Sequence, residues 1–119
     1  MRRSSLVLAV ACLLAPVSAD AQSRFDGQWS VEIVTERGDC DRAYRYAVQI
    51  RNGQVRYAGG GDFAVSGRVA QGGAVSVGIR RGRDGADARG RLSARTGAGT
   101  WTTVGSRACA GRWFAEKRG

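Results

Sequence analysis

Carboxylates are the side chains of this sequence best suited to acid–base chemistry, because the chain of 119 residues contains no histidine. Histidine is the commonest general base and the commonest neutral metal ligand in proteins. Glu32 and Glu116 end two copies of a Gly-x-Trp-x-x-Glu pattern, which begin at Gly27 and Gly111. In a strand, each glutamate would lie on the opposite face from the tryptophan of its own copy. We therefore expect surface ion pairs from these glutamates, no enzyme activity, and no cofactor or metal.

A chain-wide excess of positive charge is the second chemical feature: Lys+Arg number 19 and Asp+Glu number 10, which gives a net charge of +9. Such an excess favours anionic partners and does not determine the fold. Six arginines form a candidate basic surface: Arg80, Arg81, Arg83, Arg89, Arg91 and Arg95. Aromatic residues do not interleave with them on that face, so the stacking platforms of single-stranded nucleic-acid binders are missing. We expect a macromolecular partner, either an anionic envelope component or a secreted enzyme, and no nucleic acid; a merely solvated face is the alternative.

Aromatic residues that fall on the inward side of the expected strands are the third feature. They form a candidate interior or ligand site: Trp29, Tyr46, Phe63, Trp101 and Trp113. A small β-barrel can either fill its interior with side chains or keep a cavity for one small ligand. The expected strands are short, so we expect a filled core. A carrier of a small hydrophobic ligand is an alternative function.

The start of the chain is typical of a secretory signal peptide. Arg2 and Arg3 precede an apolar run at 6–14, and small residues at Ala19 and Ala21 suit a cleavage site. The run is too short to span a bilayer. We expect residues 1–21, with Cys12, to be removed and residues 22–119 to form one domain without a membrane span. The expected location is periplasmic or secreted.

Cys40 and Cys109 are the two cysteines that remain after this cleavage. A pair of cysteines in an exported chain is typical of a disulfide. We therefore expect them to be bonded to each other. The bridge would be structural, because no Cys-x-x-Cys arrangement is present.

Apolar and polar residues alternate with a period of two along most of the chain, which predicts strands. Asn52-Gly53 between two such segments is a strong signal for a tight hairpin. No stretch beyond the signal peptide has helical spacing. The sequence predicts an all-β fold of eight antiparallel strands in up-and-down order, at 25–35, 44–51, 54–58, 62–69, 74–80, 85–93, 99–104 and 109–117. Closure into a small barrel would remove both exposed edges and would place Cys40 and Cys109 at the same end of the first and last strands.

The expected turns set the partners across each hairpin. Turns at 52–53, 59–61, 71–73, 82–83 and 96–97 keep apolar residues on one side of the sheet. The expected pairs are Ile50 with Val55, Val55 with Val65, Val69 with Val75, Ile79 with Ala86, and Leu92 with Trp101.

Two resemblances concern the first and last strands. Gly27-Gln28-Trp29 resembles the entrance motif of calycin-type barrels: lipocalins, avidins and the periplasmic metalloprotease-inhibitor family. The ending 109–113, Cys-Ala-Gly-Arg-Trp, is similar to small Gly-rich exported proteobacterial proteins of unknown function. A second alternative function is an inhibitor of a protease or lysozyme that inserts loop 36–42 or 93–100 into an enzyme cleft. The inhibitor family itself implies a small disulfide-bonded barrel whose amino-terminal segment enters a protease cleft. That family's disulfide closes a short loop, whereas these two cysteines lie far apart.

The leading hypothesis from the sequence is a monomeric, non-enzymatic exported barrel. It would bind a macromolecule through its basic outer surface.

Overall fold

The structure is a computed structural model that describes residues 24–59 and 61–119. The predicted signal peptide, including Cys12, lies outside these residues. The all-β prediction is confirmed: eight antiparallel strands form a closed barrel. The strands are β1 (Gly27–Arg37), β2 (Ala43–Arg51), β3 (Gln54–Tyr57), β4 (Ala64–Val69), β5 (Ala74–Arg81), β6 (Asp84–Leu92), β7 (Thr96–Val104) and β8 (Ala110–Lys117).

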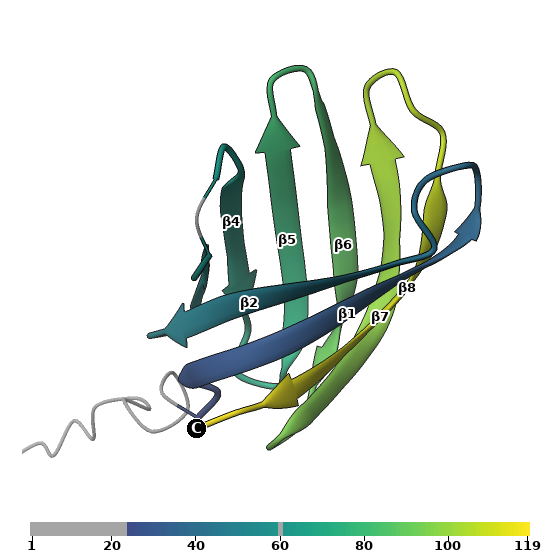
Figure 1. The fold of residues 1–119 in the computed structure, drawn as a ribbon. Coiled ribbons are helices and arrows are strands. Elements are labelled where there is room, and N and C mark those ends of the chain that lie inside the picture. The colour runs from purple at the N-terminus through teal and green to yellow at the C-terminus, as the bar shows by residue number, and fades with distance from the viewer. Residues whose placement is uncertain (1–23, 60) are drawn as a thin grey trace, which may run out of the picture.

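Each strand pairs with the next one in the chain, and β8 returns to pair with β1. In Figure 1, β1 and β2 pass in front of β4, β5 and β6, and the C-terminus lies beside the start of β1. Backbone bonds hold this end of the seam, since Gln28 donates to Gly119 (3.2 Å) and Arg118 donates to Gln28 (2.6 Å). The first and last strands are therefore neighbours, as the predicted closure of the barrel requires.

The short hairpins have the expected partners. At the β2–β3 turn, Asn52 and Gly53 both take positive φ, 52° and 76°, and Ile50 faces Val55. Val69 faces Val75 across the next tight turn, between β4 and β5. Ile79 faces Ala86 between β5 and β6. Period-two alternation and turn chemistry were sufficient for these three registers.

The predicted β3–β4 register is wrong by two residues. Val55 faces Gly67 instead of Val65, and the two strands share only one further pair, Gln54 with Arg68. Beyond these pairs the strands diverge, because the rings of Tyr57 and Phe63 pack edge to face with their centroids 5.8 Å apart. The expected three-residue turn is instead a longer connection between Tyr57 and Ala64.

The predicted β6–β7 register is also wrong. Trp101 faces Ala88 instead of Leu92, and Leu92 faces Gly97. The turn lies before Thr96, whose carbonyl accepts a bond of 2.7 Å from the Ser93 amide. The physical reason for the observed register is the size of the Trp113 indole, which packs over β7 where glycines leave room for it. A Cβ at Gly97 or Gly99, which lie nearest to this ring on β7, would meet it.

Candidate functional site

One end of the barrel is closed by the segment that enters β1. Phe25 and Trp29 are 2% and 1% exposed, and the Trp29 indole donates to the carbonyl of Phe25 (2.8 Å). The Asp26 carboxylate accepts from the amide of Asn52 (2.8 Å), which ties this segment to the β2–β3 turn. A Cβ on Gly73 would lie 3.5 Å from the Phe25 ring, so the β4–β5 turn also covers this end. We call this end, formed by 24–29 and the two turns, the closed end.

The interior is not completely filled, and the expectation of a solid core is wrong. A cavity of about 80 Å³ lies inside the barrel. Apart from the tyrosine hydroxyls and one indole nitrogen in each tryptophan, its wall consists of hydrocarbon side chains. The lining residues come from seven of the eight strands and from Phe63; those that carry the argument are Trp29, Tyr46, Tyr57, Phe63, Ile79 and Ala88.

The exposure of the inward side chains rises along the barrel and places the mouth of the cavity. On β2, Ile50 is buried while Val48 and Tyr46 are half-buried. On β5, Val75 is buried while Ile79 is half-buried. On both strands the inward side chains are therefore shielded at the closed end and partly exposed at the opposite end of the barrel. The cavity opens toward the end where β2 begins and β5 finishes.

Four aromatic rings form a cluster at this mouth: Tyr44, Tyr46, Tyr57 and Phe63, of which all but Tyr44 line the cavity. We call these four residues the aromatic rim. Tyr46 is central, with ring centroids 6.1 Å from Tyr44, 6.1 Å from Tyr57 and 6.0 Å from Phe63. Such offset and edge-on contacts hold rings in fixed orientations. The rim is therefore a cluster of rings that pack on one another at the entrance of the cavity.

The Tyr46 phenol is the polar group at the centre of the rim. Burial raises the pKa of Tyr46 above its ordinary value of 10.0, and the neighbouring Tyr44 and Tyr57 raise it further, while Arg81 acts in the opposite direction. The group therefore stays protonated near neutral pH and keeps a hydroxyl that donates and accepts hydrogen bonds. This places one polar contact point beside an apolar wall.

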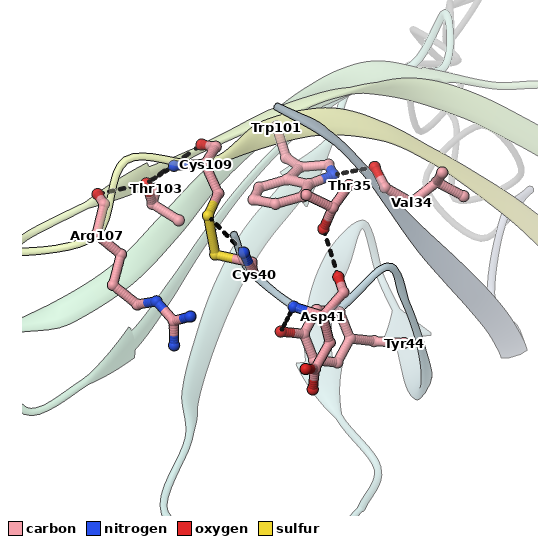
Figure 2. The surroundings of a disulfide bond; sticks show 9 residues. All are labelled: Val34, Thr35, Cys40, Asp41, Tyr44, Trp101, Thr103, Arg107 and Cys109. Atoms are coloured by element: carbon pink, nitrogen blue, oxygen red, sulfur yellow. Dashed lines mark hydrogen bonds between the residues drawn. A yellow bond between two sulfur atoms is a disulfide. The ribbon is translucent and has the colours of Figure 1, made fainter. Parts of the chain in front are cut away.

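The disulfide also lies at this end of the barrel, because Cys40 stands between β1 and β2 and Cys109 stands just before β8 (Figure 2). Cys40 and Cys109 are bonded as predicted, with their Cα atoms 6.2 Å apart. The indole of Trp101 lies nearby and donates to the carbonyls of Val34 (3.2 Å) and Arg112 (3.1 Å). Trp101 is therefore buried but does not line the cavity, contrary to its place in the candidate ligand site. The other four members, Trp29, Tyr46, Phe63 and Trp113, all line it.

Hydrogen bonds hold the loops around the disulfide. The Thr35 hydroxyl donates to the carbonyl of Asp41 (2.6 Å), and the Asp41 amide donates to the hydroxyl of Tyr44 (3.2 Å). The loop that carries Cys40 is thus tied to the aromatic rim. In the inhibitor alternative, loop 36–42 would enter an enzyme cleft; here it is fixed at the barrel end. Most of the second candidate loop, 93–100, belongs to β7.

The six arginines of the candidate basic surface do not lie together. Arg81 and Arg83 lie at the end that carries the mouth, whereas Arg95 follows β6 near the closed end and donates to the carbonyl of Lys117 (3.3 Å). Arg80 forms an ion pair with Asp87 (3.0 Å). The remaining two, Arg89 and Arg91, are exposed on the outer face of β6.

A different row of cations, three arginines that alternate with a serine and a threonine, crosses the outer face. Cross-strand pairing aligns Arg68, Ser76, Arg89, Thr100 and Arg112 on successive strands β4 to β8. A shallow hollow of about 520 Å³ lies beside it, lined by Arg56 and Arg68 among others. Sequence reasoning missed this row because its members are distant in the chain. Only the register brings them together.

The repeated glutamates lie outside the barrel, as their spacing predicts. Glu116 is exposed and forms an ion pair with Arg118 (3.4 Å). Glu32 faces Phe114 across the seam, and its neighbours Val31 and Ile33 line the cavity. Alternation therefore directs the Glu32 side chain away from the interior.

Arg81 is the functional candidate that the sequence interpretation placed in the wrong group. It lies two residues after Ile79, which lines the cavity, so strand alternation puts both on the inner face. Its guanidinium carbon is 5.4 Å from the centroid of the Phe63 ring. The alternation of inward and outward residues in β5 already indicated that Arg81 lies on the inner face. The sequence interpretation grouped it with the arginines next to it in the chain instead.

The described residues contain no cluster of three or more side chains that could hold a metal ion, and no helix long and apolar enough to cross a membrane. A disulfide is typical of oxidising compartments and fits an extracellular or periplasmic protein. The candidate site is therefore defined by its geometry: an apolar cavity, an aromatic rim and one arginine. Comparison of the chain with protein-family models, with curated proteins and with solved structures found no match.

Proposed function

We propose that this barrel binds a small apolar ligand that inserts an unbranched alkyl chain into its cavity. The observation that supports this is the shape of the interior: a hydrocarbon-lined space, shielded at one end and partly accessible at the other. An apolar cavity of this kind holds water poorly, because water finds no polar partners there. A hydrocarbon that enters it loses its own contact with water, which favours binding.

The size of the cavity limits the ligand. Its volume of about 80 Å³ is roughly half that of an engineered apolar cavity of about 150 Å³ that binds benzene. A ring system would not fit without movement of the wall. The end of a slender, unbranched chain fits, and the rest of the molecule lies at the aromatic rim.

Calorimetric titration with 1-octanol tests the proposal directly. Saturable binding is expected, with a change in tryptophan fluorescence because Trp29 and Trp113 line the cavity. The decisive variant is Ala88→Leu, which puts a larger side chain into the cavity wall and should abolish binding. The matched control is Ala98→Leu, which makes the same change at an exposed position on β7 and should bind as the unmodified protein does.

Either of two results would count against a ligand cavity. One is the absence of saturable binding to the unmodified protein. The other is equal octanol affinity in the Ala88→Leu and Ala98→Leu variants, which would show that the alcohol binds elsewhere. Circular dichroism of both variants checks that the barrel remains folded.

The row of cations on the outer face supports a second candidate function, the binding of an anionic polymer. Arg68 and Arg89 are separated by Ser76 alone, and neither forms an ion pair among the described residues. A linear polyanion could lie across the strands and contact both. Heparin binding that weakens with salt and is lost in the Arg68→Gln/Arg89→Gln variant would support it. Unchanged binding in that variant would exclude this row.

A further inference from the structure

Arg81 is a cation at the rim of an apolar cavity. Its guanidinium carbon lies 5.4 Å from the centroid of Phe63, one of the four rim residues. Its charge also acts on the Tyr46 phenol, whose pKa it lowers against the effect of burial. The guanidinium is therefore close to two members of the rim and lies where a ligand would enter.

The guanidinium of Arg81 has no carboxylate partner among residues 24–59 and 61–119. The three ion pairs there join Arg80 to Asp87, Arg112 to Glu36, and Arg118 to Glu116. Asp84 faces Arg81 across the hairpin, but its carboxylate accepts two bonds of 3.0 Å from the amide and hydroxyl of Ser106. Stacking on an aromatic ring leaves the N–H groups of an arginine available to a further acceptor.

An alkyl chain inserted in the cavity would leave its end group at the rim, beside Arg81. Guanidinium groups form charge-assisted, often bidentate hydrogen bonds with carboxylates and phosphates. We propose that the ligand is an amphiphile with an anionic end group, a carboxylate or a phosphate, and that Arg81 binds this group while the chain occupies the cavity. The inference rests on the proposed function, because it names the chemical class of the same ligand.

The test compares a neutral and an anionic ligand of the same chain length. Octanoate is expected to bind the unmodified protein more tightly than 1-octanol. The Arg81→Gln variant should lose about tenfold in octanoate affinity and keep its octanol affinity. Arg81→Lys, which keeps the charge, should lose less. Arg83→Gln is the matched control, since Arg83 lies exposed in the adjoining β5–β6 turn.

Salt and a second anion make the comparison sharper. Raising the salt concentration should weaken octanoate binding and leave octanol binding unchanged, because salt screens the charge at an exposed rim. Octyl phosphate in the same series shows which of the two anionic groups Arg81 prefers.

The possible failures are distinguishable. If neither octanol nor octanoate binds, the proposed function fails and this inference fails with it. If both bind equally well, and Arg81→Gln changes neither affinity, the cavity is a ligand site but its ligand is not recognised by charge. A loss of octanol binding in Arg81→Gln and in Arg81→Lys would show that Arg81 only packs against Phe63, and would overturn the inference.

Discussion

At the scale of single residues, glycines make room for tryptophans on the inner wall. Each of the three tryptophans donates its indole N–H to a backbone carbonyl: Trp29 to Phe25, Trp101 to Val34 and Arg112, and Trp113 to Arg89. The buried polar atom of each ring is therefore satisfied, which removes the penalty of burying it. The same spacing, glycine two residues before tryptophan, occurs on β1, β7 and β8. This spacing therefore indicates in the sequence which strands carry the tryptophans.

Gly99→Ala tests the corrected register at this scale. A Cβ at Gly99 would collide with the carbonyl oxygen of Arg89 and with the indole of Trp113. Overpacking of this kind destabilises a protein by about 1–3 kcal/mol, and urea denaturation measures the change. Thr100→Ala on the outer face of the same strand is the control and should change stability by less than about 0.5 kcal/mol. Equal effects of the two substitutions would show that β7 does not pair as described.

At the scale of elements, local patterns predicted the strands better than their partners. Two-residue turns such as Asn52-Gly53 fix the register through their own geometry, and β2–β3 was predicted correctly. The connection after Tyr57 is longer than expected, and after Leu92 the chain turns earlier than expected; in both places the register depends on ring packing between distant residues. The Tyr57–Phe63 contact and the position of Trp113 over Gly99 are tertiary facts that alternation cannot show. Alternation also could not show that Trp101 lies outside the cavity while Trp113 lines it.

The divergence of β3 and β4 predicts uneven protection of backbone amides. The Val69 amide donates to the carbonyl of Gly53 (2.8 Å), so odd-numbered residues of β4 direct their amides toward β3. Val65 is one of these residues, but the ladder between β3 and β4 ends at Val55 and Gly67. Hydrogen exchange followed by NMR should therefore be faster at Val65 than at Val69. Equal protection at the two amides would mean that the strands stay paired up to the rim.

At the scale of the whole molecule, closure leaves each strand with a neighbour on both sides. β1 and β8 share eight residue pairs along the seam, with an irregularity between Thr35 and Arg37. Closure removes the exposed edges that would otherwise pair with other chains. Closure also creates an interior, and whether side chains fill it completely depends on all the strands together. For this reason the sequence predicted the barrel but not its cavity.

The disulfide crosses this seam and should act chiefly on the unfolded chain. Cys40 and Cys109 are 69 residues apart, so their bond restricts most of the barrel once it unfolds. In the chain-entropy model a loop of this length stabilises the folded state by about 4 kcal/mol. The Cys40→Ala/Cys109→Ala variant should therefore lose about 4 kcal/mol in urea denaturation, a large part of the roughly 5–15 kcal/mol typical of a domain.

The same double variant separates stability from binding. Neither cysteine lines the cavity, and eight backbone residue pairs join β1 and β8 along the seam besides the bond. Under conditions where the variant is folded, its octanol affinity should match that of the oxidised protein. Chemically reduced protein serves as the control, because it removes the bond without changing the sequence. A folded variant with lost octanol binding would show that the bond shapes the mouth of the cavity in the native state, and that its effect is not confined to the unfolded chain.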